Sequence, residues 1–112
     1  MALAGAGPRK VTVPTLQLID VLLSEPTRRD WFGLELCRRT GLGSGTVAQI
    51  LYRLEEWRWL ESRWEDAAAA AAQRRPRRRF YRLTGEGERA ARELIRRRFP
   101  GRLGLSAEGA QA

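Results

Sequence analysis

A tight turn at residues 40–43, Thr-Gly-Leu-Gly, constrains this chain most, because it separates two segments that both have helical periodicity. Thr40-Gly41 has the form of a helix end, and a new helix is predicted from about Ser44 to Trp57. Its apolar residues recur at i, i+3, i+4 and i+7: Val47, Ile50, Leu51 and Leu54. Because this stripe belongs in a core, the opposite face is left to meet something outside the chain.

Three further segments have helical periodicity. The first is expected to begin near residue 12 or 13, with Pro14 in its first turn, and to end around residue 24. Asp30 can cap the second, which ends at the turn, and Thr84 can cap the last, which runs to about residue 99. The apolar face of the last helix carries Gly87, Ala90, Ala91, Leu94 and Ile95.

Two short segments, 60–64 and 79–83, alternate apolar and polar residues as half-buried strands do, and they can pair as a hairpin. The connection between them holds six alanines, Ala67 to Ala72, followed by an arginine-rich run from Arg74 to Arg79. The alanines could form a short helical turn. A long mobile loop is expected instead, because a connection of this length without an apolar face rarely orders itself.

Together these elements predict a mainly α fold with a small β-hairpin, that is, a winged helix-turn-helix followed by a C-terminal dimerisation helix. With 112 residues, the chain is long enough for one modest core. The expected organisation is a flexible tail at 1–11, the DNA-binding domain at 12–83, the dimerisation helix at 84–99 and a second flexible tail at 100–112.

Arginine dominates the charge of the chain, which has 21 Lys and Arg residues against 13 Asp and Glu, a formal net charge of +8. Such a surface attracts polyanions, and a basic domain of this size most often meets nucleic acid. The alternative is that an arginine- and alanine-rich genome raises the count.

Several chemistries are excluded by what the sequence lacks. It has no histidine and a single cysteine, Cys37, so an intrachain disulfide and a His/Cys metal cluster cannot form. Cys37 is expected to be a small core residue rather than a reactive thiol. No acid, base and nucleophile are assembled, so we expect no enzyme, catalytic site or cofactor. No apolar stretch has the length of a membrane span, and we expect a cytoplasmic, nucleoid-associated protein.

The helix after the turn can enter a DNA major groove, about 12 Å wide, while its apolar stripe holds it on the preceding helix. The arginine-rich connection would lie beside it, within reach of phosphates or an adjacent minor groove. The residues expected to contact double-stranded DNA are Ser44, Thr46, Gln49, Tyr52, Arg53, Arg74, Arg75, Arg77, Arg78 and Arg79. The alternative, for the helix residues and for the arginines of the connection alike, is that they form a merely solvated surface.

Several motifs follow one another along the chain: Gly33-Leu34-Glu35-Leu36, Thr40-Gly41-Leu42, Ser44-Gly45-Thr46-Val47, Arg53-Leu54-Glu55-Glu56, Trp59-Leu60-Glu61-Ser62 and the run from Arg79 to Gly87. Their order resembles the PadR regulators over roughly residues 13 to 98. The resemblance implies a winged-helix dimer of the short-tailed subgroup that binds a promoter palindrome, usually as a repressor. Some members of that family release DNA on binding a small phenolic or flat drug-like compound, so a small aromatic effector is a candidate partner.

In that family the C-terminal helix pairs the protomers, and an apolar stripe that the hairpin cannot cover also favours a partner helix here. The expected dimer interface consists of Ala91, Leu94, Ile95 and Arg98. The alternative is that this helix packs on the first helix and completes a monomeric core. The chain departs from the family at Ala48-Gln49, where Tyr-Pro is frequent, and at Arg58, where glycine is usual.

Two other functions stay open at this point. Ala48 in place of a tyrosine that commonly touches DNA leaves a winged-helix module that binds proteins without a DNA operator. An arginine-rich RNA binder is disfavoured, because RNA readers usually offer aromatic stacking platforms and Phe80 with Tyr81 are thin support. The tryptophans could line a cavity for a flat ligand, although packing in the core or a dimer interface is favoured: Trp31, Trp57, Trp59 and Trp64.

Overall fold

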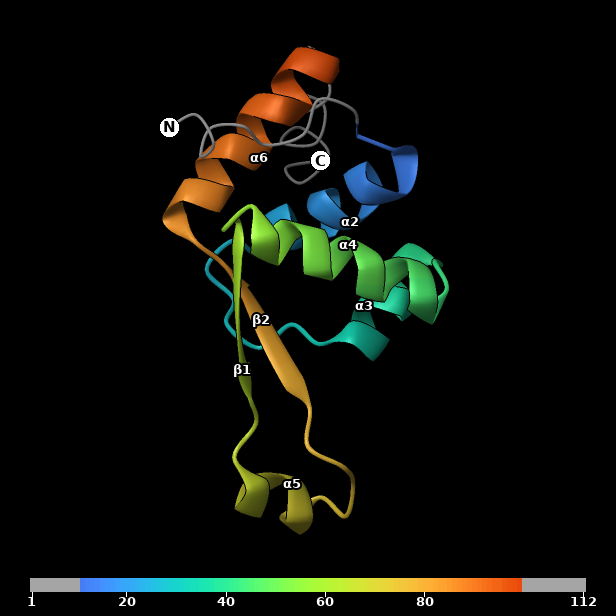
Figure 1. The fold of residues 1–112 in the computed structure, drawn as a ribbon, viewed down its shortest axis with the longest axis vertical. Helices are drawn as coiled ribbons and strands as arrows, with labels where there is room; N and C mark the ends of the chain where they lie inside the picture. The colour runs from blue at the N-terminus through green and yellow to red at the C-terminus, as the bar shows by residue number, and fades with distance from the viewer. Residues whose placement is uncertain (1–10, 100–112) are drawn as a thin grey trace, which may run out of the picture.

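The described part of the computed structural model, residues 11–99, is a body of helices from which a two-stranded wing projects (Figure 1). In chain order the elements are α2 (Val13–Ser24), α3 (Gly33–Thr40), α4 (Ser44–Glu56), β1 (Leu60–Trp64), α5 (Ala67–Ala72), β2 (Arg79–Leu83) and α6 (Gly85–Arg98). This is the predicted winged helix-turn-helix, mainly α with an antiparallel hairpin. Of the tails expected at 1–11 and 100–112, residues 1–10 and 100–112 lie outside the described residues.

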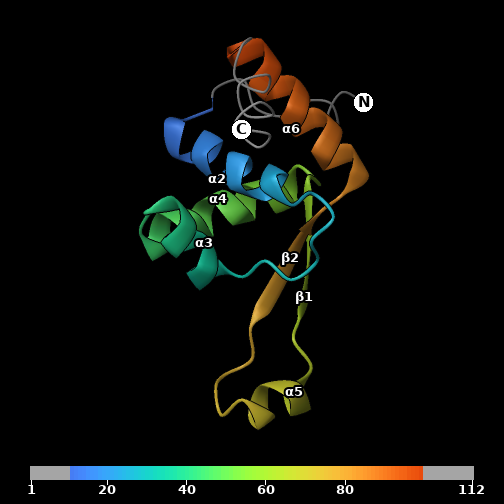
Figure 2. The ribbon, with the colours of Figure 1, turned by 180° about the vertical axis from the view of Figure 1, so that it is seen from behind.

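Helix α2 lies at the centre of the helical body, in contact with α3, α4 and α6 (Figures 1 and 2). It begins where the Thr12 hydroxyl accepts a hydrogen bond from the Thr15 amide, with Pro14 in the first turn. Its apolar residues lie on more than one face and are buried by these neighbours: Leu16, Leu18, Ile19, Leu22 and Leu23.

Helix α4 buries the stripe that the sequence predicts, since Val47, Ile50, Leu51 and Leu54 are all 3% exposed or less. Gly41 ends α3 with a φ of 79°, the left-handed conformation that glycine adopts without strain. After α4 the chain turns through Arg58, whose φ is 64°. Arginine therefore occupies a left-handed position at the site where glycine is usual.

Helix α6 packs on α2 and on the start of the hairpin. The Thr84 hydroxyl caps it by accepting a hydrogen bond from the Gly87 amide at 2.8 Å, as predicted. At Gly87 only a hydrogen fits, because a Cβ would lie 2.1 Å from the Trp59 carbonyl oxygen. The close approach of α6 to the hairpin therefore requires this glycine.

The packing of α6 corrects part of the predicted dimer interface. Ala91 and Ile95 are 0% and 1% exposed within the single chain, because α6 covers its own core. The periodicity located an apolar stripe correctly but could not show which surface covers it. Leu94 is half-buried and Arg98 is exposed, so these two stay available to a partner.

The hairpin is antiparallel, with Leu60 opposite Leu83 at its base and Trp64 opposite Arg79 at its outer end. Trp31 adds a bridge at the free edge of β2, exchanging two backbone hydrogen bonds with Tyr81 at 2.8 and 3.2 Å. The Trp31 side chain is fully buried. The base of the hairpin is thus fixed between the α2–α3 connection and the helical core.

The connection between the strands is ordered, which corrects the expected mobile loop. Ala67–Ala72 form helix α5 at the tip of the wing (Figure 1). Asp66 caps it by accepting a hydrogen bond from the Ala69 amide at 3.0 Å, and Ala70 is buried. The sequence shows no apolar face here because a single alanine methyl supplies the buried contact.

Two smaller expectations are also wrong. Asp30 does not cap α3, because the helix begins after Phe32 and has no side-chain cap. The Asp30 carboxylate instead accepts a hydrogen bond from Arg28 Nε at 2.6 Å. Val11, which was placed in the N-terminal tail, is buried at 8% exposure, and its carbonyl accepts a hydrogen bond from Arg98. The helical body therefore begins one residue earlier than predicted.

Candidate nucleic-acid interface

The outer face of α4 is solvent-exposed and polar. Tyr52 is 65% exposed, and the other predicted contact residues of this helix are also exposed: Ser44, Thr46, Gln49 and Arg53. None of these side chains forms a hydrogen bond or ion pair with another residue in the range 11–99. Because the buried stripe fixes the helix from the opposite side, these groups are presented on a rigid support with their donors and acceptors free.

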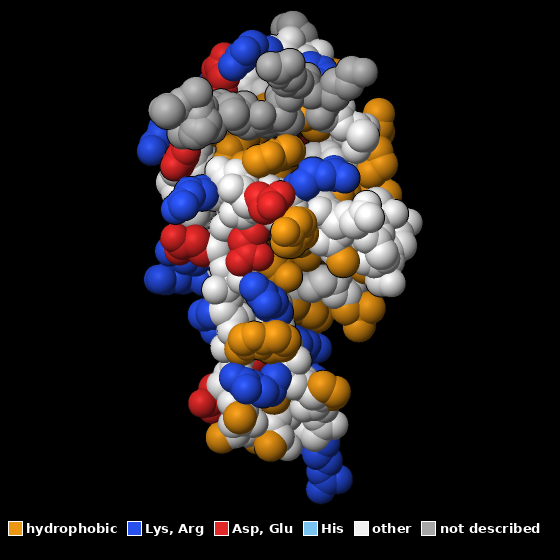
Figure 3. Space-filling model, viewed as in Figure 1, with side chains coloured by type: hydrophobic (Ala, Val, Ile, Leu, Met, Phe, Trp, Pro, Cys, Tyr) orange, Lys and Arg blue, Asp and Glu red, His pale blue; other side chains and the backbone are white. Residues whose placement is uncertain are grey.

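Charged side chains gather at the C-terminal end of α4. A polar hollow there is lined by Glu55, Glu56 and Glu61 together with Arg58, and Glu55 and Glu61 are paired with Arg79 and Arg82. Figure 3 shows acidic side chains gathered in this region, where α4 ends and the hairpin begins. Much of the negative charge there is offset by arginines of the same chain, so the exposed face of α4 from Ser44 to Arg53 is available to a polyanion.

A buried carboxylate organises the wing. Glu65, 7% exposed, accepts hydrogen bonds from both terminal nitrogens of Arg75, at 2.6 and 2.8 Å, and from the Arg78 amide at 3.1 Å. Its carbonyl accepts another from Arg77 Nε at 2.9 Å. We call Glu65, Arg75, Arg77 and Arg78 the Glu65 cluster. It ties the segment after α5 to the end of β1 and gives the wing a fixed shape.

Charge pairing in the Glu65 cluster favours the ionised form of both partners. The hydrogen bond from Arg75 holds the pKa of the Glu65 carboxyl below its usual range, although burial acts in the opposite direction. The same bond raises the pKa of Arg75. Arg75 was predicted to contact DNA, but its guanidinium is engaged within the chain.

A second group of wing side chains surrounds Trp64. Its ring is 55% exposed, and the guanidinium carbons of Arg77 and Arg79 lie 5.8 and 5.6 Å from the ring centroid. Arg79 also donates to Ser62 Oγ at 3.0 Å and to a Glu55 carboxylate oxygen at 3.4 Å. The wing is therefore linked to the C-terminal end of α4 through Arg79.

The predicted arginines thus divide into two sets. Arg75 and Arg79 are paired with carboxylates, and Arg77 uses its Nε on a carbonyl. The guanidinium groups of Arg53, Arg74 and Arg78 form no ion pair or hydrogen bond with another residue in the described chain. That of Arg78 lies 3.8 Å from the ring centroid of Phe32.

A groove of about 560 Å³ separates the α3–α4 pair from the wing. We call it the wing groove. Its lining residues come from three places: Phe32, Gly33, Leu34 and Cys37 at α3, Ser44, Val47, Ala48 and Leu51 on α4, and Arg75 to Arg79 with Tyr81 on the wing. Partial burial raises the pKa of the Tyr81 hydroxyl. In Figure 3, hydrophobic side chains gather in this region, between the helices and the wing.

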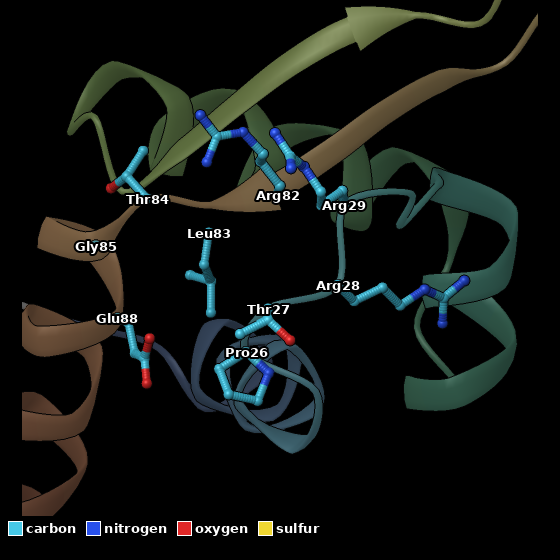
Figure 4. A pocket seen from close by; sticks show the side chains of 9 residues that line it. All are labelled: Pro26, Thr27, Arg28, Arg29, Arg82, Leu83, Thr84, Gly85 and Glu88. Atoms are coloured by element: carbon cyan, nitrogen blue, oxygen red, sulfur yellow. The ribbon is translucent and has the colours of Figure 1, made fainter.

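A smaller hollow of about 300 Å³ lies on another side, between the α2–α3 connection, the end of β2 and the start of α6 (Figure 4). Arg28, although at its edge, points away toward α3, where it forms a bidentate ion pair with Glu35 and lies 4.1 Å from the Trp31 ring. The hydrogen bond to Glu35 raises the pKa of Arg28. This ion pair holds the α2–α3 connection on α3 and directs the Arg28 guanidinium away from the hollow.

Two residues of this interface were missed by sequence reasoning. Glu65 and Trp64 stand at the end of β1, where the alternating pattern stops and gives no sign of their roles. The predicted pairing of segments 60–64 and 79–83 offers one clue, since the antiparallel register that the structure shows places Trp64 directly opposite Arg79. The other tryptophans belong to the core: Trp31 and Trp59 are buried, and the partly buried Trp57 packs against Trp59 with ring centroids 5.3 Å apart.

Comparison with known proteins gives a consistent result. The family model described as Transcriptional regulator PadR-like family matches residues 27–93, which include α3, α4 and the whole wing. A search of curated protein sequences finds no match. Across the described residues, none of the helices is long and apolar enough to cross a membrane.

Three solved structures illustrate the structural likeness. A PadR family transcription regulator from Clostridium difficile has a TM-score of 0.63 at 18% identity, covering 88% of this chain and 99% of that one. The PcaV transcriptional regulator from Streptomyces coelicolor, solved with its natural ligand, has a TM-score of 0.61 at 26% identity, covering 88% and 64%. MepR from Staphylococcus aureus, solved with DNA, has a TM-score of 0.59 at 14% identity, covering 90% and 77%.

Proposed function

The chain belongs to the PadR-like family of transcriptional regulators, and on that premise we propose that it binds double-stranded DNA with α4 in the major groove and the wing beside it. The observation that carries this proposal is the outer face of α4, where Thr46, Gln49 and Tyr52 stand exposed without polar partners on a helix fixed by its buried stripe. A helix of this kind fits the major groove.

The two surfaces have different roles in this proposal. Gln49 and Arg53 read adenine and guanine edges, because an amide and a guanidinium can make two hydrogen bonds to these bases. The unpaired guanidinium groups of Arg74 and Arg78 bind phosphates, and Arg77 contributes through its terminal nitrogens. Arg75 and Arg79 hold the wing in position, which revises their predicted role as direct contacts.

The regulator acts as a repressor on an inverted-repeat operator in this proposal, as a two-fold dimer. Half-buried Leu94 on α6 and Val13 on α2, which is 65% exposed, supply apolar surface on two helices that pack together. Two-fold pairing would present two α4 helices to half-sites about 34 Å apart. Leu94→Asp should therefore give a folded monomer with weak half-site binding, and sedimentation showing an unchanged oligomeric state would exclude this surface.

The remaining assignments follow from the same proposal. The protein works at the nucleoid in the cytoplasm, has no catalytic role or cofactor, and responds to a small aromatic effector. The wing groove, lined by apolar side chains next to α4, supports the presence of such an effector.

Electrophoretic mobility shifts test the proposal directly. The protein should bind a duplex from its own upstream region more tightly than a random duplex or an RNA of the same length. Gln17→Ala on α2 provides a matched control for Gln49→Ala, because both glutamines are exposed on a helix. Equal affinity for all three nucleic acids would contradict sequence-specific binding, and no binding to any of them would favour a protein-interaction module.

A further inference from the structure

We propose that the side of the hairpin turned away from α4 is a second phosphate-binding surface, which holds the backbone of a second DNA duplex while α4 holds the first. We call this surface the reverse face and define it by Glu61, Arg63, Phe80 and Arg82 on the strands and Arg29 beside them. The bridging of two duplexes rests on the proposed binding of DNA by α4. The phosphate site itself rests on the reverse face alone.

The register of the hairpin separates its two sides. Residues directly opposite each other on antiparallel strands point to the same side, and successive residues alternate between the sides. Ser62, which donates a hydrogen bond to Glu55 of α4, lies on one side together with Tyr81, which lines the wing groove. Arg63 and the opposite residue, Phe80, lie on the other side. A duplex held by α4 is therefore separated from Arg63 by the sheet.

The reverse face carries an excess of positive charge, because three arginines stand there against one glutamate. Glu61 is paired with Arg82. Arg29 and Arg63 form no ion pair with a carboxylate within residues 11–99. Figure 4 shows the side chains of Arg29 and Arg82 pointing to the same side, away from Glu88. Two guanidinium groups therefore keep their full charge for an anion from outside the chain.

Arg63 is held in position before any ligand binds. Its guanidinium carbon lies 4.9 Å from the centroid of the Phe80 ring, and one terminal nitrogen donates to the Arg29 carbonyl at 3.5 Å. Phe80 is itself packed edge-on against Phe32, with ring centroids 6.4 Å apart. The other donors of the Arg63 guanidinium stay free, so the side chain loses little conformational entropy when they bind an anion.

The size and position of the hollow favour the phosphate of a polymer. The reverse face surrounds about 140 Å³, below the roughly 300–1,000 Å³ of small-molecule sites. A single oxyanion group suits such a space, and guanidinium groups bind phosphate oxygens through paired hydrogen bonds. The hairpin extends away from the helices (Figure 2), which leaves room for a long polymer to approach it. DNA carries one negative charge per about 1.7 Å of its axis, so its neighbouring phosphates add to the attraction.

A bridging assay with the full chain tests the proposal. A duplex from the upstream region is immobilised on beads, and the protein is added together with a fluorescent random duplex, which it should retain. Arg29→Ala combined with Arg63→Ala should reduce this retention at least about tenfold and change the affinity for a single duplex less than about twofold. Arg89→Ala combined with Arg97→Ala removes the same charge from exposed positions of α6 and should leave the retention within about twofold.

Several results of this assay would overturn the proposal. The first is that the unaltered protein retains no second duplex. Retention that survives the loss of Arg29 and Arg63 would show that the two α4 helices of a dimer bridge the duplexes. A loss of affinity for a single duplex in the same variant would place these arginines on the duplex that α4 binds. Displacement of the fluorescent duplex by inorganic phosphate, but not by chloride at equal ionic strength, would assign the site to a free anion.

A variant blocked at α4 separates this site from the proposed function. Thr46→Glu combined with Gln49→Glu places two carboxylates on the exposed face of the helix and should abolish the preference for the cognate duplex. In that background, replacing Arg29 and Arg63 by alanine should reduce the slope of log affinity against log salt by about 1.8, or 0.9 per lost phosphate contact. An unchanged slope would overturn the phosphate site.

The two proposals can therefore fail separately. A protein whose DNA affinity does not depend on Thr46 and Gln49, but whose salt slope falls on loss of Arg29 and Arg63, would refute the proposed function and leave the phosphate site standing. Circular dichroism of each variant shows whether the helical fold is intact.

Discussion

On the outer face of α4, the side chains of Thr46, Gln49 and Tyr52 have no polar partner among the described residues, whereas on the wing Arg75 and Arg79 are paired with carboxylates of the same chain. The helix is held from below, through its buried stripe, and its outer face is free. The wing is held in shape by its own charged side chains, and part of its positive charge is therefore neutralised by carboxylates of the same chain. Arginine count therefore overestimates the phosphate contacts of the wing.

The largest effect should be on the free energy of unfolding, from a change in the buried residues that hold α4 on the core. Leu54→Ala removes a side chain that is 1% exposed and should lower the free energy of unfolding by about 2–5 kcal/mol. Ala70→Gly in α5 should lower it by only about 1–2 kcal/mol, because it removes one buried methyl and the helix propensity of one residue. Urea unfolding followed by circular dichroism measures both, and equal losses would show that the wing belongs to the same cooperative core.

The free side of α4 gives the next effect. Gln49→Ala should weaken binding to the cognate duplex by about 1–3 kcal/mol and binding to random DNA much less, because the lost contacts are to base edges. Gln17→Ala should leave both affinities unchanged. An equal loss on both duplexes would mean that Gln49 only positions the helix on the backbone.

A smaller effect on the free energy of unfolding is expected at the turn that connects α4 to the wing. Arg58 connects α4 to β1 with a φ of 64°, a conformation that costs a non-glycine residue about 1–2 kcal/mol. Arg58→Gly should therefore raise the free energy of unfolding by about 0.5–1 kcal/mol, after allowance for the greater flexibility of unfolded glycine. A loss of stability would show that the Arg58 side chain contributes more than its backbone strain costs.

The smallest effect concerns pH. Because the pKa of Glu65 is lowered in the folded protein, its pairing with Arg75 is complete above the unfolded value of about 4.3 and is lost only as the pH falls through the lower, folded value. Amide exchange protection in the wing, corrected for intrinsic rates, should therefore stay constant from about pH 7 to pH 5. Glu65→Gln should remove that protection across the range, and an unchanged wing in this variant would contradict the role of the cluster.

The sequence predicted most of the fold because periodicity and caps are local signals. The boundaries of α4 and of both strands, the cap at Thr84 and the buried stripe of α4 follow from residue spacing and are confirmed. The helix-turn-helix and the hairpin each depend on contacts between neighbours in the chain. Such contacts leave a regular pattern in the residues.

Long-range pairing left no such pattern. The order of the wing depends on Glu65 reaching across to Arg75, ten residues away, and on one buried methyl at Ala70, so an alanine run looked like a mobile loop. The burial of Ala91 and Ile95 depends on where α2 lies, and periodicity gives only the stripe. For the candidate site, the exposed residues of α4 were predictable, whereas which arginines are free depends on partners that only the folded chain brings together.

The measurement that tests the account most directly is the salt dependence of DNA affinity on cognate and random duplexes, for two variants. Arg74→Ala combined with Arg78→Ala should reduce the slope of log affinity against log salt by about 1.8, or 0.9 per lost phosphate contact, on both duplexes and keep their affinity ratio. Gln49→Ala should keep the slope and reduce the ratio. Arg89→Ala on α6 controls for net charge. A wing variant that changes the ratio, or a slope that the wing variant leaves unchanged, would contradict the division between a helix that reads sequence and a wing that binds phosphate.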